Sequence, residues 1–336
     1  MALAAAASCV CALLLPTTNQ AVSTSLRLRA PQPRVQQKQQ LGSPQQLDAD
    51  AAALLEEAGG DVGKAQVSYI GYTLAYLQSE QPELYDALKT DPTRADAHAA
   101  LVEITWDAVA AFLPVTHSPV PTPAAAKKLT AIARAACGDT NPQPRVLDVG
   151  CGNGLLLPFV SACGASASDY YGIDLSARMI EVASSSHSES GASFEDVSFD
   201  DFALRAASDS DARYDAIVFN GALQFFSDPA ATIVRAAELL SNSSESRIVL
   251  SHLSGAAFVR VEAKENPNTV RSMMPTLAEL QQIADSAGLQ VVIPSFFGAE
   301  VAEIETGLEN FFLVVLRKGG DDAEAAAQDD FSQYLP

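Results

Sequence analysis

The chain is poor in basic residues, and this scarcity limits its partners. Its 336 residues include 21 Lys and Arg against 41 Asp and Glu, which gives a net charge of −20. The charge is unevenly distributed along the chain. Residues 1–46 contain four basic residues and no acid, whereas the rest of the chain has a net charge of −24 from 17 basic and 41 acidic residues. An acidic body repels phosphate backbones, so nucleic acid is not an expected partner.

Cysteine and histidine are too few and too scattered for a disulfide framework or a structural zinc site. Two of the five cysteines stand near the N-terminus, and the body keeps an odd, widely spaced set: Cys137, Cys151 and Cys163. The four histidines show no metal-ligand spacing with these cysteines. We therefore expect no bound metal.

No apolar run is long enough to span a bilayer comfortably. Residues 3–15 are rich in Ala and Leu and resemble the core of a signal peptide, and an acid-free stretch rich in Ser, Thr, Gln and Arg follows to Gln46. This order resembles the two-part leaders of algal proteins sent to plastids, so we expect a plastid leader at 1–46 and no membrane span in the mature chain. Since no basic residue precedes the apolar run, a cytoplasmic protein with a disordered N-terminal tail is the alternative.

Residues 47–138 predict a helical segment that acts as a lid or packing module. Apolar residues recur at helical spacing around the only tryptophan, Trp106, and no strand-like alternation interrupts them. Thr122 and Pro123 make a good N-cap and first position for the last helix, and Gly138 suits its end. This segment is also the expected surface for any protein partner.

From 139 to 318 the pattern changes to strands that alternate with helices. Strands are expected at 145–149, 169–174, 195–199, 214–219, 246–251, 290–295 and 310–317, and the clearest helices at 176–187, 229–240 and 276–287. This alternation predicts an α/β, Rossmann-like sheet of seven mainly parallel strands with helices on both faces.

The end of the chain contains two acidic segments. A glycine-containing loop is expected at about 298–309, which favours an antiparallel last strand. The acidic, Ala-rich tail at 319–336 is expected to be disordered.

The run 145–154 joins a buried-strand pattern to a glycine turn. Its apolar residues fit a strand covered on both faces: Val146, Leu147 and Val149. Its glycines remove the Cβ atoms that would keep backbone away from a ligand: Gly150, Gly152 and Gly154. A helical run follows, so strand, turn and helix predict the first unit of a nucleoside-binding sheet.

The stretch from Asp148 to Gly154 resembles the D-x-G-x-G-x-G signature of class I S-adenosylmethionine-dependent methyltransferases. Asp174, at the end of the next expected strand, stands where an acid accepts hydrogen bonds from ribose hydroxyls. The resemblance covers about 140–317 and implies S-adenosylmethionine as cofactor and methyl transfer by direct displacement. The cofactor contacts it implies are Asp148, Gly150, Cys151, Gly152, Gly154, Asp174, Leu175, Asp200, Asp201 and Asn220, with Asp200 or Asp201 at the adenine amino group.

Two other interpretations stay open. A nicotinamide oxidoreductase is disfavoured because the third glycine follows the second by two positions, whereas the dinucleotide fingerprint needs three. An acid beside the turn would also repel a pyrophosphate. The other interpretation is a methyltransferase-like protein without activity that serves as a binding or assembly partner.

Two polar residues are candidate catalytic groups. Asn220 ends the fourth expected strand, where its amide suits substrate or cofactor, although a turn-capping role is the alternative. His252 follows the fifth strand and has a pKa range suited to removing a proton, although a structural histidine is the alternative. Because the body of the chain lacks a basic patch for RNA or DNA, we expect a small-molecule substrate as methyl acceptor.

Overall fold

The computed structural model describes residues 44–116, 120–138, 143–207, 213–298 and 300–319. Most of the expected leader and nearly all of the acidic tail lie outside these ranges, so their proposed roles stay predictions. The described residues form two compact units. We call the first, up to 116 together with 265–269, the helical unit, and the remainder the sheet unit.

The helical unit is built from consecutive helices, as expected. They are α2 (Pro44–Glu57), α3 (Val62–Glu80), α4 (Pro82–Thr90), α5 (Ala95–Ala111) and α6 (Leu113–Thr116). Asp61 caps α3 by accepting a hydrogen bond from the Lys64 backbone N–H at 3.1 Å. Small and apolar side chains of α2, α3 and α5 pack together around Phe112, which is 1% exposed.

Helix α7 (Pro123–Cys137) belongs to the sheet unit, which moves the boundary between the units. The sequence places that boundary at 138/139, whereas among the described residues the division falls between 116 and 120. The caps of α7 are those expected: Thr122 Oγ1 accepts from a backbone N–H, and Gly138 ends the helix with φ of 64°. The apolar face of α7 can be recognised in the sequence, but the sequence does not show that the sheet covers this face.

The sheet unit contains a seven-stranded sheet in the order β3-β2-β1-β4-β5-β7-β6. The strands are β1 (Val146–Val149), β2 (Tyr170–Asp174), β3 (Ser193–Asp196), β4 (Ala216–Asn220), β5 (Arg247–His252), β6 (Leu289–Val292) and β7 (Phe312–Lys318). The first five strands pair in parallel, and β7 pairs antiparallel with both β5 and β6. The expected antiparallel last strand is thus confirmed.

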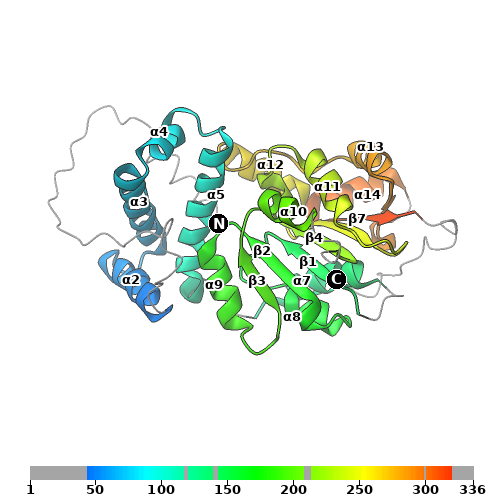
Figure 1. Cartoon of the computed structure of the whole chain (residues 1–336), viewed down its shortest axis with the longest axis horizontal. Coiled ribbons are helices and arrows are strands. Elements are labelled where there is room, and N and C mark those ends of the chain that lie inside the picture. The colour runs from blue at the N-terminus through cyan, green and yellow to red at the C-terminus, as the bar shows by residue number, and fades with distance from the viewer. Residues whose placement is uncertain (1–43, 117–119, 139–142, 208–212, 299, 320–336) are drawn as a thin grey trace. The chain divides into compact units, whose positions relative to one another are not determined.

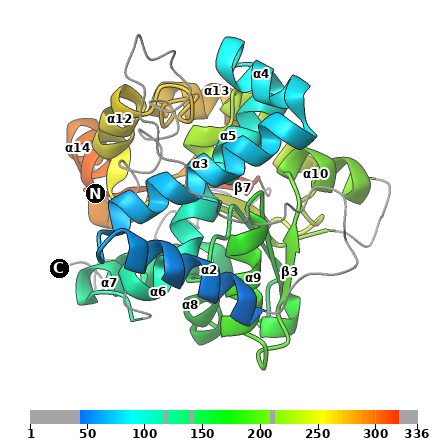
Figure 2. The ribbon, with the colours of Figure 1, turned by 90° about the vertical axis from the view of Figure 1, so that its left-hand side faces the viewer.

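Helices cover both faces of this sheet. They are α7, α8 (Leu157–Ala162), α9 (Ala177–Ser186), α10 (Phe199–Ala207), α11 (Pro229–Glu238), α12 (Gly255–Glu265), α13 (Leu277–Ala287) and α14 (Val301–Asn310). Short 3₁₀ turns lie at Ala167–Asp169, Leu223–Phe225 and Ser295–Phe297. Helices α7, α8 and α9 lie on one face and α10, α11 and α13 on the other (Figure 1), and the turned view in Figure 2 shows the same division.

Helix α14 replaces the loop expected at about 298–309. It begins with a capping box formed by Glu300 and Glu303. Gly307, which favoured a loop in the sequence, sits inside this helix because a Cβ there would lie 2.2 Å from the Phe297 ring. Packing against Phe297 therefore explains the glycine in this helix, although the acidic sequence around it resembles that of a loop.

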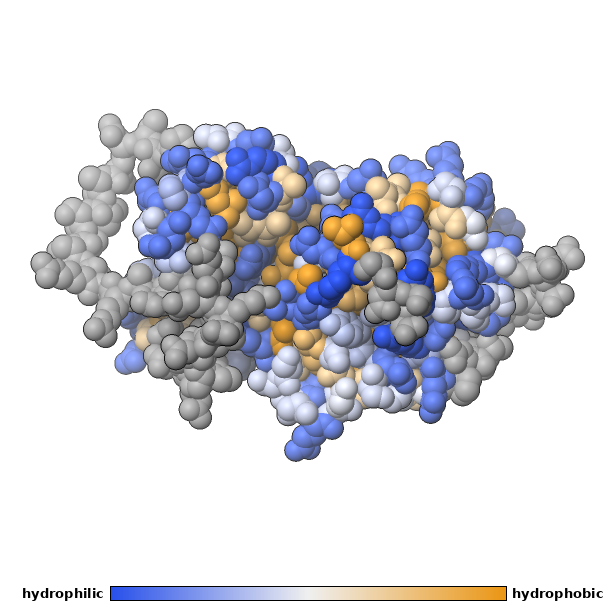
Figure 3. Space-filling view, in the orientation of Figure 1, coloured by the Kyte–Doolittle hydropathy of each residue, from blue (hydrophilic) through white to orange (hydrophobic). Residues whose placement is uncertain are grey.

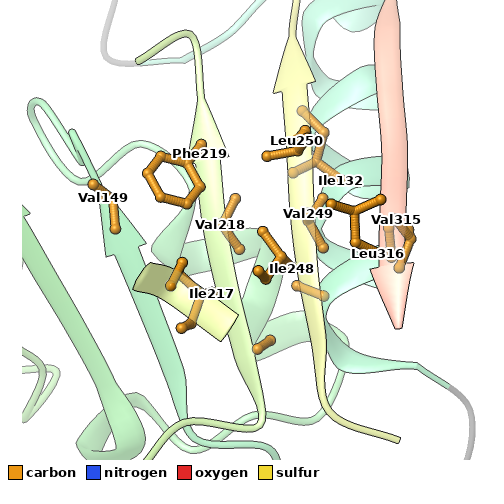
Figure 4. Close-up of a cluster of buried hydrophobic side chains, with 14 of the residues drawn as sticks. Ile132, Val149, Ile217, Val218, Phe219, Ile248, Val249, Leu250, Val315 and Leu316 are labelled. Atoms are coloured by element: carbon orange, nitrogen blue, oxygen red, sulfur yellow. The ribbon is translucent and has the colours of Figure 1, made fainter. Parts of the chain in front are cut away.

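The core of the sheet unit lies between the central strands and the helices. Figure 4 shows Ile132 of α7 together with apolar side chains of β4, β5 and β7, among them Phe219 and Leu250. These side chains are fully or almost fully buried, so strands covered on both faces explain the continuous apolar runs in the sequence.

The surface of the sheet unit is mixed in character. Over α10 and α11 the visible face combines hydrophilic and hydrophobic residues (Figure 3). In the part of the chain that the structure describes, no helix combines the length and apolar character needed to cross a membrane.

Candidate cofactor and acceptor site

The candidate site lies at the carboxyl ends of the central strands. Strand β1 pairs with β2 on one side and β4 on the other. The helices that follow β1 and β2 lie on one face, and those that follow β3 and β4 lie on the opposite face (Figure 1). Such a reversal opens a crevice outside the carboxyl ends of the strands, where open α/β sheets bind ligands.

The glycine loop after β1 is fastened to the end of β2. The backbone N–H groups of Gly150 and Cys151 both donate to the Ile173 carbonyl, at 2.8 and 3.0 Å. Gly150 has φ of 71°, and a Cβ there would lie 2.6 Å from that of Ala222. Cys151 is buried and burial raises the pKa of its thiol well above the ordinary value, so the side chain is neutral. Contact between Cys151 and the cofactor stays a prediction.

Gly152 forms the open part of the loop. Its φ is 53°, and no protein atom lies within 4 Å of the position that a Cβ would occupy. Its backbone N–H donates to Asp174 Oδ2 at 2.9 Å. The positive φ and the space above the residue form a cradle that a side chain would fill, and this cradle fits the close approach of a cofactor.

Asp174 connects the loop to the next helix. Its Oδ1 accepts a hydrogen bond from the Ser176 backbone N–H at 2.9 Å, so both carboxylate oxygens accept hydrogen bonds from the backbone. Burial raises the pKa of Asp174, and hydrogen bonds from backbone N–H groups, including that of Leu175, oppose the rise. Asp174 thus lies at the end of β2, as the sequence predicts, and its hydrogen bonds to ribose hydroxyls stay a prediction.

Asp148 lies inside the sheet beneath the loop and is 1% exposed. The hydroxyl of Tyr170 donates to its Oδ2, whereas Oδ1 has no hydrogen-bond partner among the described residues. Burial raises the pKa of Asp148 to about 7, the Tyr170 hydrogen bond opposes this rise, and the charge of Asp174 adds to it. A buried oxygen without a partner destabilises the fold, and a cationic amino group would satisfy it directly or through water.

His187 and Phe194 support the last glycine of the loop, a role that the sequence did not reveal. Their rings stack at 5.8 Å between centroids. A Cβ on Gly154, whose φ is 74°, would lie 2.9 Å from the His187 ring and 3.2 Å from that of Phe194. Burial lowers the pKa of His187, and a hydrogen bond to the Gly154 backbone opposes that shift. In the sequence, His187 is a polar residue at the end of an expected helix, so nothing there predicts its contact with the glycine loop.

Asp200 and Asp201 lie in the first turn of α10, because β3 ends at Asp196, three residues before the expected end. Both aspartates are exposed. Asp200 forms an ion pair with Arg235, and Asp201 Oδ2 accepts from the Ser198 hydroxyl at 2.7 Å. The pairing of either acid with adenine stays a prediction.

Asn220 and His252 end the neighbouring strands β4 and β5. Asn220 Oδ1 accepts a hydrogen bond from the Ser251 hydroxyl at 3.1 Å, which turns the amide nitrogen away from that hydroxyl. The Cδ2 edge of His252 lies 3.8 Å from where a Cβ of Gly221 would stand. The structure thus brings the two candidate catalytic residues to one part of the sheet edge.

The surroundings of His252 favour a neutral ring. Burial and then the positive charge of Lys128 lower its pKa to about 4. Its Nδ1 accepts a hydrogen bond from the Ser254 backbone N–H at 3.2 Å, so the proton of the neutral ring is on Nε2. The ring also stacks on Phe258 at 5.5 Å between centroids. In this arrangement His252 can donate a hydrogen bond, whereas the lone pair that a base needs is already engaged.

Lys128 of α7 forms hydrogen bonds with two distant segments on this side of the site. Its ammonium donates to the Leu253 carbonyl at 2.6 Å and to the Asn310 carbonyl at 3.1 Å. These partners lie 125 and 182 residues away along the chain. Sequence reasoning missed Lys128 for that reason, since nothing distinguishes it from the adjacent Lys127.

Comparison with known proteins identifies the sheet unit. Residues 122–293, just over half of the chain, match a family model described as a methyltransferase domain. A 158-residue segment is 30% identical to the ubiquinone biosynthesis O-methyltransferase of Thiobacillus denitrificans. This segment covers 44% of the chain and 64% of that relative, so the chain matches less than two thirds of the relative's length.

Solved structures of methyltransferases are among the similar folds. Magnesium protoporphyrin IX methyltransferase of Synechocystis with bound S-adenosylmethionine is 17% identical, with a TM-score of 0.37 over 74% of this chain and 97% of that one. The YcgJ protein of Bacillus subtilis is 19% identical, with a TM-score of 0.41 over 57% and 99%. The family match agrees with the glycine loop, Asp174 and the strand order. The chain belongs to the class I S-adenosylmethionine-dependent methyltransferases, and its cofactor is S-adenosylmethionine.

Proposed function

We propose that this chain is an active methyltransferase that methylates an oxygen atom of a small molecule. The observation that carries the proposal is the convergence of Gly152, Asp174 and Asn220 at the carboxyl ends of neighbouring strands, each with backbone space or polar atoms left for a ligand. A similar relative is an O-methyltransferase of ubiquinone biosynthesis, which supports oxygen as the acceptor atom. The acidic body of the chain supports a small molecule over RNA or DNA.

The residues of the loop have distinct tasks in this proposal. Asp174 would bind the ribose hydroxyls, Gly152 would let the backbone approach the cofactor, and Asp148 would balance the charge of the amino group. When bound, the cofactor would supply a sulfonium methyl group whose carbon the acceptor atom attacks directly, with S-adenosylhomocysteine as the leaving group. The protein contributes alignment of the acceptor and a site from which water is excluded.

Asn220 and His252 would hold the acceptor. With Nδ1 engaged by the Ser254 N–H, His252 offers its Nε2–H as a donor. An acceptor oxygen that loses its proton readily, as in a phenol or a carboxylic acid, would need only such donors to position it. This differs from the expectation that His252 removes a proton, and the two roles predict different pH profiles.

Calorimetry and a transfer assay together test the proposal. The full chain should bind S-adenosylhomocysteine and should transfer labelled methyl groups to members of a panel of phenols, quinols and carboxylic acids. Tight binding of S-adenosylhomocysteine with no transfer across the panel and a cell extract would favour the inactive, protein-binding alternative. Thermal stabilisation by NAD(P) alone would contradict the cofactor assignment.

A further inference from the structure

Two cysteines meet on the face of the sheet unit that carries α7 and α8. Cys137 is the last residue of α7, and Cys163 follows the last residue of α8. The Cys137 thiol donates to the Val160 carbonyl at 3.6 Å, and the Cys163 backbone N–H donates to the same carbonyl at 3.1 Å. Both cysteines therefore contact the same carbonyl group, Cys137 through its thiol and Cys163 through its backbone. The turn that contains Cys163 thus encloses the sulfur of Cys137.

The two thiols differ in access to solvent. Cys137 is 2% exposed, whereas Cys163 is half-buried and can meet a small oxidant. The remaining described cysteine, Cys151, is buried in the glycine loop. A partly exposed thiol beside a buried one is the arrangement in which the first reacts and the second resolves the product.

The electrostatics of the pair support the same order of reaction. The hydrogen bond from Cys137 and then the positive charge of Arg134 lower the pKa of the Cys163 thiol, while burial opposes them. The pKa of Cys137 is raised by its hydrogen bond to Cys163 and by burial. Since the thiolate is the nucleophile, Cys163 is the thiol that reacts first.

We propose that Cys137 and Cys163 form a reversible disulfide when the protein meets a peroxide. The Cys163 thiolate attacks one oxygen of hydrogen peroxide, which breaks the O–O bond, leaves a sulfenic acid and releases hydroxide. The Cys137 sulfur then attacks the sulfenic sulfur and loses its proton, and water leaves. One peroxide is reduced to two water molecules as two thiols are oxidised, and a dithiol reductant restores both thiols.

The bond would close a covalent loop around the cofactor-binding segment. Residues 137–163 contain β1, the whole glycine loop and α8. A cross-link across such a loop restricts the unfolded chain, which stabilises the folded state if the native geometry accepts it. Because Cys137 and Cys163 already contact the same Val160 carbonyl in the folded protein, oxidation is expected to raise the melting temperature by several degrees.

Peptide mapping of the full chain tests the pairing. The protein is treated with hydrogen peroxide, alkylated with N-ethylmaleimide, digested and analysed by mass spectrometry. We expect a dithiothreitol-sensitive peptide pair that joins Cys137 to Cys163, with Cys151 alkylated in the unfolded digest. The Cys151→Ser variant should form the same pair. Equal alkylation of Cys137 and Cys163 with and without peroxide, or pairing of either with Cys151, would overturn the proposal.

Two further variants distinguish disulfide formation from a purely structural contact between the two cysteines. In Cys137→Ser, Cys163 should be trapped as a sulfenic acid that reacts with dimedone, whereas in Cys163→Ser, Cys137 should stay reduced. Oxidation should raise the melting temperature of the wild-type chain and leave that of Cys163→Ser unchanged. A lower melting temperature of the cross-linked protein would show that the bond strains the fold instead of stabilising the loop.

Discussion

The two halves of the site are held together in different ways. Around the glycine loop, the fixing hydrogen bonds join residues close in sequence: Asp174 bonds Ser176 two residues on and Gly152 22 residues back. Around His252, Lys128 bonds carbonyls 125 and 182 residues away. The candidate cofactor half is therefore a property of two successive strands, β1 and β2, and their connection, whereas the candidate acceptor half forms only after distant elements have packed.

The largest expected effect comes from removing the carboxylate of the cofactor half. Asp174→Ala should weaken S-adenosylhomocysteine binding by about a hundredfold or more, because it removes two hydrogen bonds to a charged group, each of about 1.5–3 kcal/mol, and releases Gly152. Calorimetry measures the change. Asp169→Ala, in the turn just before the opposite end of the same strand, is the matched control and should bind as the wild type does. Equal binding by Asp174→Ala and wild type would contradict this cofactor site.

Alanine substitutions at two glycines of the loop should distinguish a loss of cofactor affinity from a loss of stability. Alanine at either position adopts a positive φ at a cost of about 1–2 kcal/mol. Gly152→Ala meets no protein atom and should therefore lower cofactor affinity roughly tenfold with a modest fall in melting temperature. Gly154→Ala also meets His187 and Phe194 and should melt at a clearly lower temperature.

A double variant checks the assignment of that clash. His187→Ala removes the ring that the new methyl group would meet, so the pair Gly154→Ala and His187→Ala should recover part of the melting temperature relative to the sum of the single changes. If the two losses simply add, His187 does not support the loop in the way described.

The buried carboxyl of Asp148 predicts a pH dependence of stability. Its folded-state pKa of about 7 lies above the ordinary value of 3.8, so the folded chain holds the proton more tightly than the unfolded chain. The free energy of unfolding should thus fall as pH rises from about 4 to about 7, by up to about 1.4 kcal/mol per pH unit. Urea unfolding at several pH values measures this slope.

The Asp148→Asn variant isolates this contribution from those of other carboxyl groups. It cannot ionise, so its stability relative to the wild type should improve steadily across the same pH window. Asp169→Asn is the control and should follow the wild-type curve. Parallel curves for Asp148→Asn and the wild type would show that Asp148 is not a protonated carboxyl in the free protein.

The sequence predicts the sheet well because each strand is locally encoded. All seven expected strands exist, and the D-x-G-x-G-x-G run, together with Asp174, marks the cofactor half through residue type and spacing alone. The errors occur where packing decides. The partner of the apolar face of α7 is the sheet, and the Phe297 ring requires glycine at position 307 of α14. Neither fact is visible in the local pattern.

The acceptor half shows the same limit more strongly. Asn220 and His252 can be proposed from their positions at strand ends, but the direction of their hydrogen bonds cannot. Whether His252 is a base depends on the Ser254 N–H and on the charge of Lys128, which comes from another helix. Residue type and position therefore predict where the chemistry occurs, and tertiary contacts decide which role each group takes.

The smallest expected effect, and the sharpest test of the acceptor half, concerns His252. If its ring acts as a donor, His252→Gln should retain methyl transfer within about threefold, because the amide can still donate, whereas His252→Phe should lose about tenfold through one hydrogen bond of about 1.4 kcal/mol. With a pKa of about 4, His252 should contribute no change to the rate between pH 6 and 8. Transfer rates across that range for the three proteins measure both effects.

The ring's own titration provides an independent readout. Nuclear magnetic resonance should place the His252 pKa near 4 in the wild type and higher in Lys128→Met, because the nearby positive charge is removed. Lys127→Met, the adjacent residue, is the matched control and should leave the His252 signal unchanged. If instead the rate decreases as the pH is lowered through about 6.5, and if Gln and Phe at position 252 abolish transfer equally, His252 is the base. Its Nδ1 hydrogen bond would then be broken in the substrate complex.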